Sequence, residues 1–118
     1  MKIAHISDLH IGKYLKGYSL AEDQRYILKQ IVEVMKEEAP DVLLIAGDVY
    51  DKSAPSGEAF SLFDDFLTDL DELSGTMTVL IIAGNHDSPE RLDFASGFLE
   101  RHVNDLLYCP RHLLYIPQ

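Results

Sequence analysis

Cysteine is almost absent from this chain, since Cys109 is the only one among 118 residues. One cysteine cannot form an internal disulfide framework, and it excludes a Cys-x-x-Cys zinc or redox site. No apolar run reaches the ~18 residues that a membrane-spanning helix needs. The first residues lack the charged segment, long apolar segment and cleavage site of a signal peptide. We therefore expect a soluble protein that resides in the cytoplasm, with no membrane partner.

Positive charge is also scarce. Ten lysines and arginines stand against twenty acidic residues, which gives a net charge of −10 and a pI of about 4.7. This balance argues against a basic protein that coats duplex DNA, because such proteins gain affinity by neutralising phosphates. It does not argue against an enzyme whose carboxylates hold metal ions, because the ions reverse the local charge. With 47% hydrophobic residues, the chain is long enough for one domain with its own core.

Three short apolar runs predict strands at Lys2–Ser7, Val42–Ala46 and Thr78–Ala83. Their length, their Ile, Leu and Val content and the glycines after the second and third runs are typical of strands buried on both faces. A fourth strand is expected at Leu113–Ile116.

Helical patterns separate these runs. The first begins with a predicted capping box at Ser19–Glu22 and ends at Pro40, and further helices are expected at Ser56–Leu73 and Ser88–Glu100. The alternation predicts an α/β fold, a parallel-centred sheet flanked by helices with right-handed crossovers.

Metal-ligand side chains follow each of the three runs. Parallel strands bring their carboxyl ends to one edge of a sheet, so residues about 40 positions apart should meet there. Glycines directly before the second and third sets allow the backbone to turn sharply and to approach the metal ions closely. Each set alone is compatible with an ordinary turn, but the three in succession favour a site for Mn²⁺, Fe²⁺ or Zn²⁺, and two ions fit better than one. The residues are Asp8 and His10, then Asp48 and Asp51, then Asn85, His86 and Asp87.

The successive motifs DxH, GDxxD and GNHD resemble those of the calcineurin-like metallophosphoesterase superfamily. The residues around them are similar to the SbcD family of nuclease subunits within it. The similar segments are His5–Lys13, Ser19–Arg25, Gly47–Pro55 and Ala83–Leu92.

The resemblance implies a role for each motif residue. Asp8 and His10 would bind a first metal ion, and Asp48 would bridge two ions. Asn85 would bind the second ion, and His86 would contact the phosphate and stabilise or protonate the leaving oxygen.

Two further carboxylates, Asp51 and Asp87, would orient these groups from behind, as is usual around metal sites. The resemblance also implies that residues 1–118 are the amino-terminal part of a metallophosphoesterase domain, half of an αββα sandwich. The family's later histidines would then be missing, because His102 and His112 follow no glycine and are interpreted as surface or structural residues.

The function implied by the resemblance is that of a Mn²⁺-dependent DNA nuclease. It would hydrolyse phosphodiesters as an exonuclease and hairpin endonuclease, together with an SbcC-type SMC-like ATPase, in DNA repair and recombination. The parent would use two Mn²⁺ ions, whereas this chain would hold at most one weakly and lack activity. The alternatives are another phosphatase or cyclic-nucleotide phosphodiesterase of the superfamily, and a non-catalytic dimerisation fragment.

Family dimers pair the helices that follow the second and third motifs, which implies a homodimer here. The aromatic surplus on the two predicted helices supports such an interface, although all of these residues are also compatible with a core. The expected interface residues are Phe60, Phe63, Phe94 and Phe98.

Three residues after the first motif, Tyr14, Lys16 and Tyr18, are open to two interpretations. They can contact nucleic acid by stacking and charge, or they can belong to a mobile loop.

Overall fold

The computed structural model describes residues 1–73, 77–84 and 106–109, and within them the chain forms an α/β fold. Two helices and six strands follow one another along these parts of the sequence. They are β1 (Ile3–Ile6), β2 (Tyr14–Leu15), β3 (Tyr18–Ser19), α1 (Ala21–Glu38), β4 (Val42–Ala46), α2 (Gly57–Asp71), β5 (Thr78–Ile82) and β6 (Leu106–Cys109).

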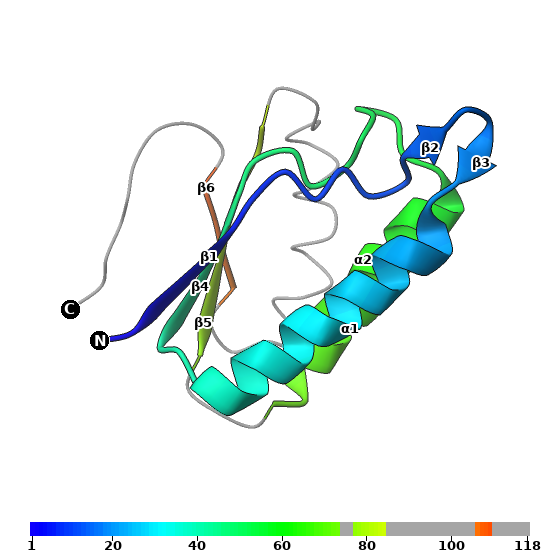
Figure 1. Cartoon of the computed structure of the whole chain (residues 1–118). Helices are drawn as coiled ribbons and strands as arrows, with labels where there is room; N and C mark the ends of the chain where they lie inside the picture. The colour runs from blue at the N-terminus through cyan, green and yellow to red at the C-terminus, as the bar shows by residue number, and fades with distance from the viewer. Residues whose placement is uncertain (74–76, 85–105, 110–118) are drawn as a thin grey trace.

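The four main strands form one parallel sheet in the order β1-β4-β5-β6 (Figure 1). Ile3 pairs with Val42 and Ile6 with Ile45, so β1 and β4 end side by side. All of these strands run in one direction, and the loops after β1 and β4 therefore leave the sheet at the same edge. The predicted fold class is confirmed.

The core lies between the sheet and the two helices, which pack on the same face of it (Figure 1). Leu43 and Ile45 of β4 are fully buried there, whereas Leu44 between them is only partly buried. On β1 and β5, Ile3 is 56% exposed and Ile82 is 40% exposed. The prediction that the strands are buried on both faces is therefore wrong for the described residues, because both described helices cover one face.

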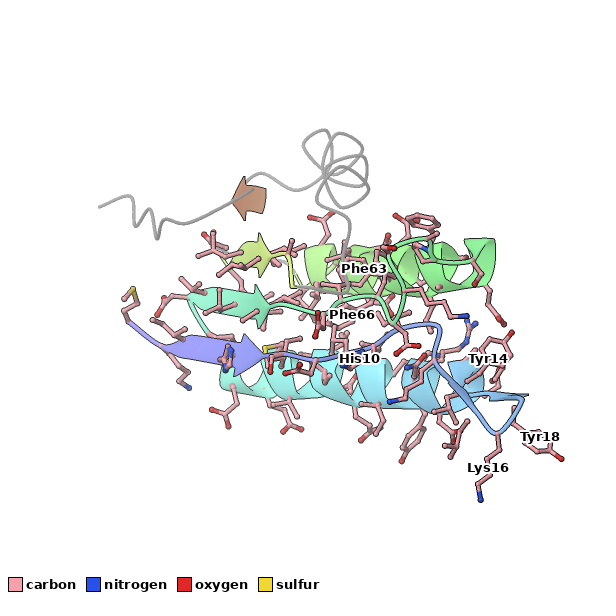
Figure 2. All side chains as sticks on the ribbon, turned by 90° about the horizontal axis from the view of Figure 1, so that it is seen from above. His10, Tyr14, Lys16, Tyr18, Phe63 and Phe66 are labelled. Carbon is pink, nitrogen blue, oxygen red and sulfur yellow. The ribbon has the colours of Figure 1, made fainter. Side chains whose placement is uncertain are left out.

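The aromatic residues of α2 face this core. Phe63 is 1% exposed and its ring lies 5.6 Å from that of Tyr50, in an edge-to-face arrangement. Figure 2 shows Phe63 and Phe66 on the side of α2 that faces the sheet. Phe63 thus has almost no exposed surface that a partner could contact. The expectation that it lies at a dimer interface is therefore corrected. Phe60 is half-buried, while Phe94 and Phe98 lie outside the described residues.

The helix ends differ from the prediction in one respect. Leu20 caps α1 without a side-chain hydrogen bond, so the predicted capping box at Ser19–Glu22 is wrong. Ser19 is already paired with Tyr14 in the β2–β3 hairpin, which places it one residue before the cap. Its hydroxyl oxygen still accepts the N–H of Ala21 at 3.2 Å.

The second helix has a side-chain cap at its first turn. Ser56 Oγ accepts the Ala59 N–H at 3.2 Å, an arrangement that typically stabilises a helix by ~1 kcal/mol.

Two predicted elements, the helix at Ser88–Glu100 and the strand at Leu113–Ile116, lie outside the described residues. Two observed elements were not predicted. These are the β2–β3 hairpin and the strand β6.

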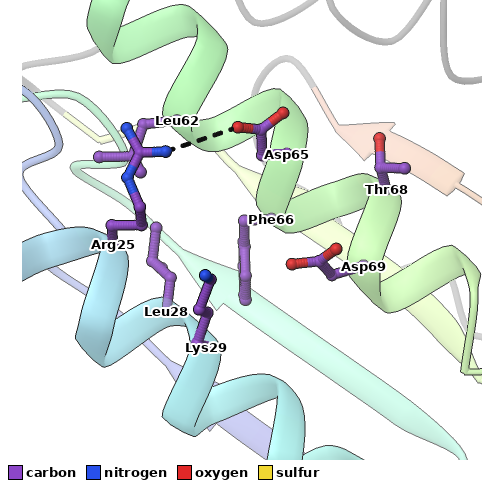
Figure 3. A pocket seen from close by; sticks show the side chains of 8 residues that line it. All are labelled: Arg25, Leu28, Lys29, Leu62, Asp65, Phe66, Thr68 and Asp69. Atoms are coloured by element: carbon purple, nitrogen blue, oxygen red, sulfur yellow. Dashed lines mark ion pairs between the residues drawn. The ribbon is translucent and has the colours of Figure 1, made fainter. Parts of the chain in front are cut away.

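A groove of about 220 Å³ lies between α1 and α2. Leu28 and Phe66 line it together with charged side chains, and Arg25 Nη1 lies 3.9 Å from Asp65 Oδ2 across it (Figure 3). Within the part of the chain that the structure describes, no helix combines the length and the apolar character required to cross a membrane.

Candidate metal centre

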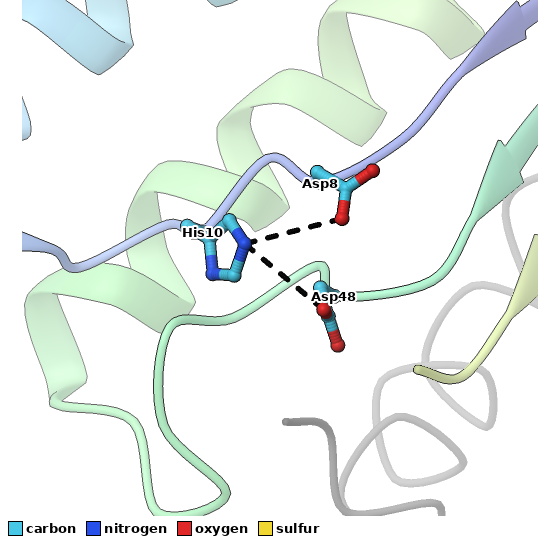
Figure 4. A group of neighbouring side chains, drawn as sticks. All are labelled: Asp8, His10 and Asp48. Atoms are coloured by element: carbon cyan, nitrogen blue, oxygen red, sulfur yellow. Dashed lines mark ion pairs between the residues drawn. The ribbon is translucent and has the colours of Figure 1, made fainter. Parts of the chain in front are cut away.

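Asp8, His10 and Asp48 lie together at the carboxyl edge of the sheet. Each offers one ligand atom, and these atoms all lie within 4.8 Å of one another. The His10 Nε2 atom is 4.0 Å from Asp8 Oδ1 and 4.0 Å from Asp48 Oδ2 (Figure 4). The structure therefore brings together three of the four predicted metal ligands, although Asp48 is forty positions from Asp8 in the sequence.

The backbone aligns the two loops that carry these residues. The parallel pairing of β1 and β4 continues past the strand ends as a series of hydrogen bonds, which fixes the first loop in register with the second. Three N–H groups of the first loop donate to carbonyls of the second: Asp8 to Gly47 (3.1 Å), His10 to Asp48 (3.0 Å) and Ile11 to Val49 (2.9 Å).

All three clustered residues have left-handed backbone conformations. The φ angles are 54° at Asp8, 45° at His10 and 47° at Asp48. A residue other than glycine typically loses about 1–2 kcal/mol in this region, because Cβ crowds the following carbonyl. Such positions persist only where the surrounding structure fixes them, and they concentrate at functional sites. The backbone at these three residues is thus more strained than the backbone of an ordinary turn.

The segment just after β5 also approaches the cluster, through Gly84. A Cβ atom built on Gly84 would overlap the Asp48 carboxylate and backbone nitrogen, and it would lie 2.9 Å from Asp48 Cγ. Only glycine leaves room for the aspartate here. The predicted close approach of this glycine to a metal ion stays a prediction. Gly47, directly before Asp48, has a φ of 79° and provides the predicted sharp turn.

Asp51 lies behind the imidazole. Its Oδ1 atom is 3.3 Å from His10 Nδ1, so the other ring nitrogen, Nε2, is the one that faces Asp8 and Asp48. A carboxylate in this place holds the ring of a metal-binding histidine in the correct orientation and tautomer.

The donor set suits a divalent cation. Carboxylate and imidazole groups without thiolate are ligands for Mn²⁺, Fe²⁺ or Zn²⁺. A cation would also neutralise the carboxylates that converge on His10. The remaining predicted site residues, Asn85, His86 and Asp87, lie outside the described residues, as do His102 and His112.

Residues 1–116 match the calcineurin-like phosphoesterase family. The chain belongs to this family. The match covers nearly the whole chain and includes all three clustered residues, and it confirms the expected resemblance. Because the calcineurin-like phosphoesterases are metal-dependent, the family assignment supports a divalent metal at Asp8, His10 and Asp48.

Within this phosphoesterase family, the chain is similar to the D subunit of the nuclease SbcCD from Staphylococcus saprophyticus. The two are 46% identical over 101 residues, which are 86% of this chain and 27% of that protein. This chain therefore spans about a quarter of the length of that relative.

Sequence reasoning did not single out Gln24, although the structure places its side chain against the loop that carries His10. The only signal in the sequence is its position in the segment Ser19–Arg25, which is similar to the SbcD family.

Proposed function

We propose that this chain provides metal-binding residues of a nuclease subunit that hydrolyses phosphodiester bonds in DNA. The observation that carries the proposal is the convergence of Asp8, His10 and Asp48 at the carboxyl edge of the sheet. A bound divalent ion would polarise the phosphoryl group and lower the pKa of a water molecule. Mn²⁺ is the proposed metal, with two ions in the full-length parent.

The position of Asp48 supports its proposed role as the bridging ligand. Its side chain is 15% exposed and lies between the loop after β1 and Gly84, just after β5. It therefore lies near Asp8 and His10 on one side and against Gly84 on the other. Asn85 comes directly after Gly84 and is proposed to hold the second ion, with His86 beside it as the group that contacts the phosphate.

The β2–β3 hairpin supports a nucleic acid over a small substrate. Tyr14 is 56% and Tyr18 is 78% exposed, and Lys16 lies between them at the turn. Figure 2 shows these side chains projecting from one end of the molecule, beyond the loop that carries His10. Exposed aromatic rings stack on bases, and lysine neutralises phosphate. The hairpin would thus provide a surface for DNA beyond the loop that carries His10.

The name of the relative describes it as one subunit of an SbcCD nuclease. This supports a protein partner, which we propose to be an SbcC-type SMC-like ATPase, and a role in DNA repair and recombination. Two other interpretations remain. A phosphatase or cyclic-nucleotide phosphodiesterase would share the metal motifs, whereas a non-catalytic dimerisation fragment would need no metal. They become outcomes of the test.

A chimera provides that test. The matched region of the Staphylococcus saprophyticus nuclease subunit is replaced by the corresponding residues of this chain, and cleavage of labelled duplex DNA is measured with Mn²⁺. We expect cleavage, and we expect Asp48→Ala to abolish it while Asp64→Ala, on the exposed side of α2, does not. A chimera that hydrolyses only a small phosphodiester would favour the phosphatase alternative. Equal cleavage by Asp48→Ala and the unsubstituted chimera would contradict the proposal.

A further inference from the structure

The Gln24 side chain, from the first turns of α1, reaches the loop that follows β1. Its Oε1 atom accepts the Gly12 N–H at 3.0 Å. Its Nε2 atom donates to the His10 carbonyl at 2.8 Å and lies 3.4 Å from the Leu9 carbonyl. Both ends of the amide are therefore bonded to the backbone of one short loop, and this loop carries a candidate metal ligand.

His10 depends on contacts of this kind because of its left-handed backbone, with φ of 45°. On one side its N–H donates to the Asp48 carbonyl at 3.0 Å. On the other side its carbonyl accepts from Gln24 and from the Lys13 N–H, the latter at 3.2 Å. The loop after β4 thus holds His10 through its N–H, and the helix α1 holds it through its carbonyl.

The next residues of the loop are packed tightly. Gly12 has a φ of 88°, and a Cβ atom built on it would lie 2.9 Å from Ala59 Cβ of α2. The loop therefore lies against α2 at Gly12 and is hydrogen-bonded to α1 through Gln24. Of these two contacts, only that with Gln24 reaches the backbone of His10.

We propose that Gln24 is a positioning residue for the metal centre, which fixes the backbone of His10 so that Nε2 faces Asp8 and Asp48. The inference rests on the proposed function, because it assigns Gln24 a role toward the same metal. An amide is the side chain that this place requires, since it must accept from Gly12 and donate to His10 at once. A glutamate of the same size accepts only, and a methionine does neither.

The first measurement needs no metal. Amide hydrogen exchange is followed by nuclear magnetic resonance in the metal-free 118-residue chain, comparing Gln24→Met with Gln30→Met, a matched change at an exposed glutamine of the same helix. We expect Gln24→Met to speed exchange at Gly12 and His10 by at least about tenfold and to leave the amides of β4 unchanged. Exchange at both positions equal to that in Gln30→Met would overturn the inference.

A second variant distinguishes loss of the Gln24 hydrogen bonds from loss of folding. Gln24→Glu keeps the size and the acceptor for Gly12 but removes the donor to His10. We expect protection to persist at Gly12 and to fall at His10. Unchanged protection at His10 in this variant, with circular dichroism like that of the wild type, would overturn the inference.

The third measurement is Mn²⁺ affinity by calorimetry. We expect Gln24→Met to weaken binding about tenfold, as losing an outer contact of a metal ligand typically does, and Gln30→Met to leave it unchanged. Faster exchange at His10 with unchanged Mn²⁺ affinity would overturn the positioning role. Absence of Mn²⁺ binding by the wild type would instead contradict the metal centre itself, and the exchange comparison would still decide whether Gln24 fixes His10.

Discussion

At the scale of single residues, Asp48 is constrained through both its backbone and its side chain. Its carbonyl accepts the His10 N–H, its φ is 47°, and Gly84 lies against its carboxylate. A ligand that bridges two ions needs this kind of fixed position, because a small displacement separates it from one of them. The role proposed for Asp48 thus depends on Gly84, just after β5, as much as on the aspartate.

A change at Gly84 tests this dependence. In Gly84→Ala the new methyl group overlaps the Asp48 carboxylate, so we expect Mn²⁺ affinity to fall at least about tenfold. Gly57→Ala is the matched control, since a Cβ atom at Gly57 meets nothing within 4 Å. Calorimetric titration of both variants gives the comparison. If the two bind Mn²⁺ equally well, Gly84 is not needed for the position of Asp48.

The clustered residues could be predicted from the sequence, but their conformation could not. Asp8, His10 and Asp48 follow apolar runs, and the topology of a parallel sheet is enough to bring them to one edge. Their left-handed backbones and the contact between Gln24 and His10 arise from hydrogen bonds between segments distant in sequence. No local pattern reports such contacts.

At the scale of elements, the β2–β3 hairpin is too short to be predicted from the pattern of apolar and polar residues. Its strands have two residues each, too few for an alternation of apolar and polar residues to be visible. Its turn consists of Lys16 with φ 49° and Gly17 with φ 83°, and two successive positive φ angles are typical of a tight hairpin turn. The sequence leaves a mobile loop open as an interpretation of this segment, and the structure describes it as a hairpin of two paired strands.

The hairpin predicts an effect on DNA binding. In the chimera, Tyr14→Ala and Tyr18→Ala should each weaken binding of a single-stranded oligonucleotide about tenfold, because one stacked base typically contributes ~1–3 kcal/mol. Tyr26→Ala is the control, since Tyr26 is 63% exposed on α1 and lies outside the hairpin. Fluorescence anisotropy measures the three affinities. Equal losses, or no loss, in all three variants would remove the hairpin from the proposed DNA surface.

The helices were easier to predict than their ends. The helix expected at Ser56–Leu73 is observed at Gly57–Asp71 with Ser56 as its cap, because serine followed by a long apolar stripe is a local signal. The start of α1 differs from the prediction because Ser19 is engaged in β3, a pairing that the helix signal does not contain.

At the scale of the whole molecule, the sheet is covered by described helices on one face only. The apolar runs suggested burial on both faces, but Ile3 and Ile82 retain exposed fractions of 56% and 40%. Composition and periodicity report that a strand is apolar, and they do not report which neighbouring segment covers each face. The parallel direction of the strands could be predicted, because it follows from the alternation of strands and helices.

The partial exposure of Phe60 leads to a prediction about the association of two copies of this chain. It is half-buried on α2, and its ring lies 5.3 Å from that of Tyr50, so it is the described member of the proposed dimer interface that keeps some accessible surface. We expect light scattering to report a dimer at micromolar concentration and Phe60→Glu to shift it toward monomer. Ser61→Glu, at the neighbouring exposed position, is the control. A wild-type chain that stays monomeric would contradict the proposed homodimer.

The central claim is that Asp8, His10 and Asp48 form a divalent metal site, and a Mn²⁺ titration of the 118-residue chain tests it most directly. Among the described residues three protein ligands cluster, enough for one weakly held ion. A second ion would have only Asp48 and the proposed ligand Asn85, too few protein groups for a complete two-ion centre. We therefore predict at most one Mn²⁺ per chain by calorimetry, no cleavage of duplex DNA by this chain alone, and loss of the bound ion in Asp48→Asn. Binding of Mn²⁺ with the same affinity by the wild type and Asp48→Asn would contradict the account.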